Sequence, residues 1–159
     1  MFITTSRKPS AKTRSFCQSL SRALNSKYVN RGKMSFRDVL IKASQSGFQK
    51  IAVVSQMKGN PSRIEIYNEK GEILIILYIS GVLLNLKGRI DSDKLSIRSE
   101  IDDLKKRLIK VLDIAEDHEK RNTNILWIRK GKGENKATLE FYDKHGSLID
   151  PKIYVRRFE

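Results

Sequence analysis

The chain of 159 residues is 39% hydrophobic, enough for one domain or for two small halves that share a core. It carries 32 basic and 18 acidic residues, and its net charge of +14 indicates a polyanionic partner, nucleic acid before an anionic membrane surface. The single cysteine excludes an internal disulfide and a cysteine-based metal site, and it fits a reducing, cytoplasmic environment.

The first forty residues combine positive charge with regular apolar spacing. Nine basic residues precede the first carboxylate, Asp38. The apolar residues between them predict a strand at residues 2–3, a helix after Ser10, a strand at 28–29 and a second helix after Ser35. The core-facing helix positions are Phe16, Leu20, Ala23 and Leu24, followed by Phe36, Val39, Leu40 and Ala43. The basic groups are therefore expected on an ordered β-α-β-α frame.

Basic turns lead into both helices. The start of the first helix offers backbone N–H groups and side-chain charge to an anion, but a capped surface helix with solvated charges explains the same spacing equally well. Gly32 lets the backbone of the second turn approach a phosphate, and Ser35 with Asp38 has the spacing of a capping box. The residues predicted to bind RNA phosphates are Arg7, Lys8, Lys12, Arg14, Arg31, Gly32, Lys33 and Arg37.

The middle of the chain predicts further strands. One spans residues 48–55, a turn at Lys58–Pro61 follows, and residues 63–67 alternate as the next strand. The apolar run 73–86 is about fourteen residues long, short of the roughly 20 residues that cross a membrane. We therefore expect one or two buried strands and no membrane partner, although an edge or patch of this run could instead face a partner protein.

The second half predicts one long helix and three strands. Residues 88–99 are polar and are the expected connector, and Ser99 with Asp102 has the spacing of a second capping box. Asp103 and Arg107 have ion-pair spacing on a helix. The face expected to be buried consists of Ile101, Leu104, Leu108, Leu112 and Ala115. The expected strands lie at 125–128, 137–142 and 153–155, with a basic turn at 130–133.

The two halves also resemble each other. The first reads Ile51-Ala52-Val53-Val54, Lys58-Gly59, Ile64-Glu65-Ile66-Tyr67-Asn68 and Gly71. The second reads Ile125-Leu126-Trp127-Ile128, Lys132-Gly133, Leu139-Glu140-Phe141-Tyr142-Asp143 and Gly146. We infer an α/β (α+β) fold in which a helix-strand-hairpin unit is duplicated about a pseudo-twofold axis. Chance similarity between two amphipathic hairpins is the alternative.

The sequence shows no constellation that supports catalysis. No His, Cys and carboxylate cluster has metal-ligand spacing, and no glycine-rich nucleotide loop follows a strand. His118 and His145 are expected to be solvated and Cys17 to be buried. Trp127 and Tyr142 could stack on a base, although half-buried positions in a sheet are the commoner explanation. We therefore predict no enzyme, no cofactor and no small-molecule substrate.

Six segments of the first half form a specific pattern. They are Ile3-Thr4-Thr5-Ser6-Arg7-Lys8-Pro9-Ser10, Thr13-Arg14-Ser15-Phe16, Asn30-Arg31-Gly32-Lys33-Met34-Ser35, Arg37-Asp38-Val39-Leu40, Ala52-Val53-Val54-Ser55 and Gly59-Asn60-Pro61-Ser62-Arg63-Ile64. This pattern resembles the opening of the Brix-domain ribosome-biogenesis proteins, and most closely their short archaeal members. From Glu72 onward only length and element order are similar.

The resemblance implies a single domain over 1–159, with an N-terminal half at about 1–88 and a C-terminal half at about 99–159. Each half would resemble the anticodon-binding domain of class IIa aminoacyl-tRNA synthetases. The implied function is ribosome assembly and pre-rRNA processing by binding rRNA or pre-rRNA, without catalysis, with other ribosome assembly proteins as further partners. A protein-interaction module within a pre-ribosomal particle is the alternative.

Overall fold

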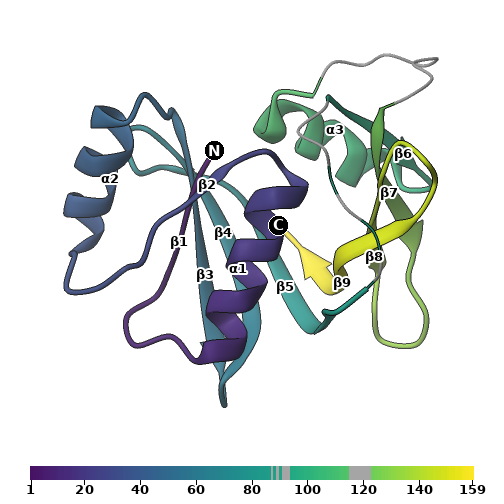
Figure 1. The fold of residues 1–159 in the computed structure, drawn as a ribbon, viewed down its shortest axis with the longest axis horizontal. Coiled ribbons are helices and arrows are strands. Elements are labelled where there is room, and N and C mark those ends of the chain that lie inside the picture. Colours follow the sequence, from purple (N-terminus) through teal and green to yellow (C-terminus); the bar gives the residue numbers. More distant parts are fainter. Residues whose placement is uncertain (87, 89, 91–93, 115–122) are drawn as a thin grey trace.

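The computed structural model describes residues 1–86, 88, 90, 94–114 and 123–159. Within these residues the chain forms three helices and a sheet of nine strands (Figure 1). In chain order the elements are β1 (Phe2–Thr5), α1 (Ala11–Ala23), β2 (Lys27–Tyr28), α2 (Phe36–Gln45), β3 (Lys50–Met57), β4 (Asn60–Asn68), β5 (Ile73–Leu83), β6 (Leu95–Ser99), α3 (Asp102–Leu112), β7 (Asn124–Lys130), β8 (Ala137–Tyr142) and β9 (Leu148–Phe158). The predicted mixed α/β class is confirmed.

The sheet runs through both parts of the chain in the order β2-β1-β3-β4-β5-β9-β8-β7-β6. β1 pairs in parallel with β2 and β3, and β6 pairs in parallel with β7, while the remaining neighbours are antiparallel. The last strand, β9, returns to the middle and pairs with β5. The β5–β9 pairing therefore joins the N-terminal strands to the C-terminal ones.

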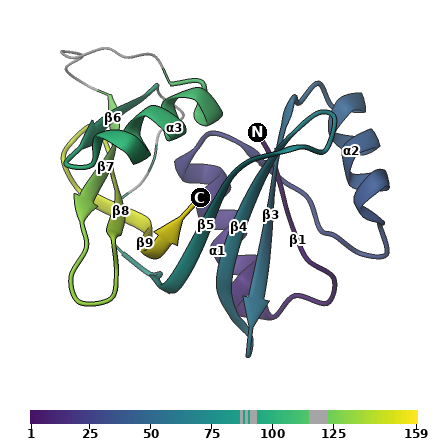
Figure 2. The same cartoon turned by 180° about the vertical axis from the view of Figure 1, so that it is seen from behind.

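The helices cover the two faces of the sheet unequally. Residues of α1 and α3, among them Phe16 and Leu104, enter one hydrophobic cluster with residues from both ends of the sheet. On the opposite face, Val39 and Ala43 of α2 pack against Phe2 and other residues of β1 and β3. Figure 1 shows α1 in front of the N-terminal strands, and Figure 2 shows β3, β4 and β5 from behind, with α1 beyond them.

The first helix has the predicted amphipathic register. Phe16, Cys17 and Leu20 are buried, whereas Arg14 and Gln18 are exposed. Burial raises the pKa of the Cys17 thiol to about 12, so the side chain stays neutral in the core. The strong apolar periodicity of this segment was sufficient to place the helix within one residue of its observed start.

Two predictions around the third helix are wrong. Ile101, not Ser99, is the N-cap of α3, and its side chain makes no capping hydrogen bond. The Ser99 hydroxyl instead donates to the Ile101 carbonyl (2.8 Å) and accepts from the Ile101 N–H (2.9 Å). Ser99 is the last residue of β6, a strand within the predicted polar connector that pairs with β7. Its apolar residues, Leu95 and Ile97, alternate with polar ones and pack on the core, a short strand pattern that the prediction overlooked. Ala115, predicted on this helix, lies outside the described residues, while Leu104 and Leu108 are buried as expected.

The predictions for the middle strands need two corrections. The run that begins at Ile73 forms one strand, β5, whose residues 73–78 pair with β4 and whose residues 77–83 pair with β9. Its first residues, Ile73 and Leu74, are exposed, so the run is only partly buried. Pro61 lies in β4 and not in a loop, since the turn consists of Lys58 and Gly59 alone. Both turn residues have positive φ, as a type I′ hairpin requires.

Candidate nucleic-acid interface

Three loops meet at one edge of the sheet. β1, β2 and β3 are parallel, so their carboxyl ends and the loops that follow them lie together (Figure 1). Two of these loops lead into α1 and α2. The predicted basic residues lie in these loops and in the first turns of the helices, and Lys58 joins them from the β3–β4 turn. We call this set the basic edge: Arg7, Lys8, Lys12, Arg14, Arg31, Gly32, Lys33, Arg37 and Lys58.

Hydrogen bonds fix the first of these loops to the β3–β4 hairpin. The Ser10 hydroxyl donates to the Gly59 carbonyl (2.7 Å), and the Ser10 N–H donates to Gln56 Oε1 (2.8 Å). The Thr13 hydroxyl donates to the same Gln56 oxygen (2.8 Å), and Lys12 Nζ donates to Asn60 Oδ1 (2.9 Å). The start of α1 is therefore held at a fixed position, and its charges project from a rigid base.

Both helix N-termini are capped by protein groups. Ser10 accepts a hydrogen bond from the Thr13 N–H (3.1 Å). In the predicted capping box of α2, Ser35 Oγ accepts from the Asp38 N–H (3.1 Å) and Asp38 Oδ2 accepts from the Ser35 N–H (3.0 Å). The hydrogen bonds of Ser35 lower the pKa of Asp38. Each cap occupies one helix N–H group, that of Thr13 or that of Asp38, so an anion at the basic edge would rely mainly on side-chain cations.

Arg31 differs from its basic neighbours because its guanidinium is tied to the protein backbone. Nε donates to the Met34 carbonyl (2.8 Å) and Nη1 donates to the Thr5 carbonyl (2.9 Å), which joins the α2 loop to the end of β1. Burial lowers the pKa of Arg31, and the positive charge of Arg7 acts in the same direction. Two cations thus lie near each other at this turn. Gly32 has a φ of +53°, so glycine suits its backbone conformation.

We expect Arg31→Ala to lower the free energy of unfolding by roughly 1–3 kcal/mol, because two half-buried carbonyl groups lose a charged donor. Urea unfolding followed by circular dichroism measures this change. Lys33→Ala is the matched control: Lys33 is an exposed cation two residues away, and its loss should change stability by less than about 0.5 kcal/mol. Equal stability of the two variants would show that the Arg31 hydrogen bonds do not hold the loop.

A basic hollow adjoins this edge. It has a volume of about 840 Å³ and lies where β4, β5 and β9 meet the β3–β4 hairpin. Among the described residues, no carboxylate side chain lines it. Its five basic lining residues are Lys12, Lys58, Arg63, Arg156 and Arg157. Lys12 belongs to the basic edge as well, so positive charge continues from the loops into the hollow.

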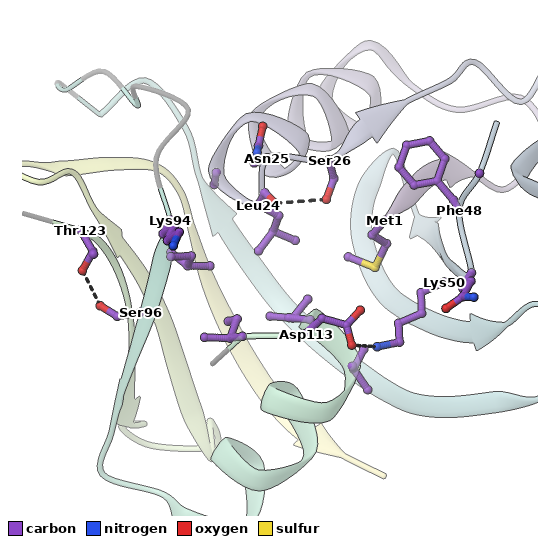
Figure 3. Close-up of a pocket in the computed structure, with 17 residues that line it drawn as sticks. Met1, Leu24, Asn25, Ser26, Phe48, Lys50, Lys94, Ser96, Asp113 and Thr123 are labelled. Atoms are coloured by element: carbon purple, nitrogen blue, oxygen red, sulfur yellow. Dashed lines mark hydrogen bonds and ion pairs between the residues drawn. The ribbon is translucent and has the colours of Figure 1, made fainter. Parts of the chain in front are cut away.

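A second hollow, of about 600 Å³, lies between the start of the chain and the end of α3 (Figure 3). Lys50 Nζ contacts Asp113 Oδ1 (2.5 Å) and the Lys110 carbonyl (2.6 Å) across it. Lys94 and Thr123 on its rim adjoin residues outside the described part of the chain. We therefore place no site in this hollow.

Other candidate groups remain apart. No group of three or more His, Cys, Asp or Glu side chains in the described residues could hold a metal ion. His145 lies exposed in the β8–β9 turn, and His118 lies outside the described residues. No helix in the described part of the chain is both long and apolar enough to cross a membrane.

Comparison with known proteins places the chain in a family, although no family model matches it. It is 56% identical over 71 residues to the probable Brix domain-containing ribosomal biogenesis protein of Methanothermobacter thermautotrophicus, a match that covers 45% of this chain and 43% of that protein. The match to its counterpart in Archaeoglobus fulgidus has 46% identity over 70 residues and covers 44% of this chain and 42% of the relative. These matches span less than half of the curated relatives.

The solved structure of Mil, an archaeal Imp4-like protein, is similar over the whole length. It is 33% identical, covers 100% of this chain and 99% of Mil, and has a TM-score of 0.81. The chain belongs to the Brix-domain, Imp4-like family. The Brix fold also matches a probable ribosomal biogenesis protein from Aeropyrum pernix K1 at 20% identity, with a TM-score of 0.84 over 97% of this chain and 93% of the other. The predicted resemblance is confirmed.

The sequence located only part of the basic surface of this Brix-domain protein. The eight predicted residues lie at or next to the carboxyl ends of the parallel strands, and all but Arg31 are exposed. Gln56, which fixes the first loop, was missed because its role depends on the fold of the hairpin. Arg63 and Arg157 were missed as well, since the pairing of β4 with β5 and of β5 with β9 is what brings them to one hollow.

Proposed function

We propose that this Brix-domain protein binds rRNA or pre-rRNA and assists ribosomal subunit assembly without catalysing a reaction. The basic edge carries the proposal: exposed cations stand on loops held by hydrogen bonds, and Asp38, the one carboxylate in the first forty residues, is engaged in a capping box. Phosphate contacts from such side chains give affinity and orientation, with little dependence on base sequence. The names of the curated relatives, ribosomal biogenesis proteins, support the same function.

We propose the eight predicted residues as phosphate ligands, with Arg31 acting mainly as a support for its loop. Lys58, next to the first loop, extends the set. The basic turn at 130–133 would widen the contact. Precursor rRNA and other assembly proteins are the proposed partners, and the cytoplasm is the proposed location.

The domain organisation is also a proposal: one Brix domain over 1–159, with two similar halves. The strand directions support it, since β1-β3-β4-β5 and β6-β7-β8-β9 each begin with a parallel pair followed by two antiparallel pairs. The Tyr67 hydroxyl bonds to Glu65, and the Tyr142 hydroxyl bonds to Glu140, at the matching positions of the proposed repeat. The pseudo-twofold axis and the likeness to an anticodon-binding domain stay predictions.

Crosslinking in native cells, followed by sequencing of the RNA that copurifies, tests the function. We expect precursor rRNA to be enriched at a few defined sites, which would also identify the subunit. RNA spread evenly over the transcriptome, with a protein recovered in near-equal amount, would contradict the proposal. It would favour a protein-interaction module, for which the exposed Ile73, Leu74 and Met57 offer apolar contacts.

A further inference from the structure

One face of the sheet carries aromatic and basic side chains that no described helix covers. α1 and α3 pack on the opposite face, and the cluster under α2 reaches no further along the sheet than Tyr67 of β4. Strand register directs alternate residues of β4 to β9 toward this side. We call it the uncovered face; its basic and aromatic members are Arg63, Tyr78, Arg157, Lys152, Tyr154, Tyr142, Trp127, Arg129 and Arg98.

The aromatic rings of this face are paired with cations. The Arg129 guanidinium lies 3.9 Å from the Trp127 ring centroid, and that of Arg98 lies 5.0 Å from it. Arg157 lies 3.9 Å from the centroid of Tyr78. These contacts hold rings and guanidinium planes in fixed positions, and the Arg129 and Arg157 side chains that lie over the rings are 42% and 53% exposed, so another planar group can stack on them.

Two further contacts extend the pattern across the face. Lys152 Nζ is 5.5 Å from the Tyr154 ring, and the rings of Trp127 and Tyr142 are 5.9 Å apart. Tyr154 lies on β9, between Tyr78 on β5 and Tyr142 on β8 in strand order. A row of rings and cations therefore crosses the sheet from β5 to β6.

The carboxylates on this face are internally neutralised. Glu140 is only 5% exposed, accepts a hydrogen bond from the Tyr142 hydroxyl (2.5 Å) and lies 3.7 Å from Arg129 Nη1. Glu65 lies 2.9 Å from Arg63 Nε and accepts from the Tyr67 hydroxyl, and Glu159 lies 3.1 Å from Arg157 Nη1. The excess charge of the face is positive, as an anionic ligand requires.

The uncovered face is continuous with the basic surface. Arg63, Tyr78 and Arg157 line the 840 Å³ hollow together with Lys12, which belongs to the basic edge. A strand of RNA bound at that edge could therefore follow the hollow onto the sheet. Its phosphates would meet cations along the way, and its bases would meet aromatic rings.

We propose that the uncovered face is a stacking platform for unpaired nucleotides of single-stranded RNA, an inference that rests on the proposed function. Bases stack on aromatic rings and on guanidinium planes, and both are presented here. A base paired within a duplex cannot offer its flat surface in this way. The platform would thus add a preference for single-stranded segments to the phosphate contacts of the basic edge.

Trp127 is the single tryptophan of the chain, so its fluorescence reports on ligands that bind at the uncovered face. The intrinsic fluorescence of the full chain is titrated with a twelve-nucleotide single-stranded oligouridine, and in parallel with a twelve-base-pair RNA duplex. We expect strong quenching by the single strand and weak quenching by the duplex at equal saturation, measured independently by filter binding.

The variants Tyr78→Leu and Tyr154→Leu test the platform without removing the reporter. Each should weaken single-strand binding about tenfold and leave duplex binding nearly unchanged, since one stacking surface is lost and apolar bulk is kept. Phe48→Leu is the matched control: Phe48 is also a half-buried aromatic residue, but it packs in the cluster under α2, and its change should have no effect on binding. Unchanged emission of the free variants verifies that the sheet is intact.

The outcomes separate the two proposals. RNA binding without quenching by the single strand, and with wild-type affinity in both tyrosine variants, would overturn the platform and leave the proposed function standing. The face would then be assigned to a protein partner. Failure to bind either RNA at low salt would overturn the proposed function itself.

Discussion

Replacing Arg7, Lys8, Lys33 and Arg37 together by glutamine is expected to weaken RNA binding at least about a hundredfold near 0.1 M salt. The four side chains are exposed and have no hydrogen-bond partner among the described residues, so their charge is available to phosphate. Each lost phosphate contact should reduce the slope of log affinity against log salt by about 0.7–0.9, or by roughly 3 for the four. Filter binding of a precursor rRNA fragment between about 50 and 200 mM salt measures both quantities.

A charge-matched variant distinguishes the basic edge from the general charge of the protein. Lys42, Lys70, Lys106 and Lys110 are also exposed, but they lie away from the three loops. Their replacement by glutamine removes four positive charges as well and lowers the net charge from +14 to +10. We expect this variant to keep most of the salt slope. A similar loss in both variants would show that RNA is held by diffuse charge and not at the basic edge.

Sequence reasoning succeeded where a local pattern determines the structure. Ser10 and Ser35 cap their helices as predicted, because a cap depends on residues three positions apart. The same pattern failed at Ser99, where backbone pairing of β6 with β7 keeps that residue in a strand. A capping motif therefore predicts a helix start only when the chain before it is free to turn.

The candidate site could be predicted only in part, because its members meet through strand pairing. Apolar alternation identified most strands, yet it cannot specify that β9 returns to β5. That pairing places Arg157 beside Tyr78, two residues 79 positions apart in the chain. Sequence likewise could not show that Arg31 donates to the Thr5 carbonyl, since this bond requires the loop after β2 to lie against β1.

The replacement Phe16→Ala should destabilise the whole domain and not only its N-terminal half. Phe16 is fully buried, and loss of such a ring costs about 3–5 kcal/mol. Its cluster contains Leu126 and Ile128 from the strand that bears Trp127. If the chain is one cooperative unit, the urea midpoint followed by Trp127 fluorescence should fall as far as the midpoint followed by far-ultraviolet circular dichroism.

This comparison decides between one domain and two, because the mutated residue and the reporter lie in different halves of the chain. Two independently folded halves would leave the Trp127 transition unchanged while the dichroism transition split. Phe16→Leu provides a milder change should the alanine variant unfold completely. Gln18→Ala, on the exposed side of the same helix, should shift both midpoints by less than about 0.5 kcal/mol. If both midpoints fall together in the two Phe16 variants, α1 couples the basic edge to the C-terminal strands. An RNA bound at the basic edge would then stabilise both halves of the chain.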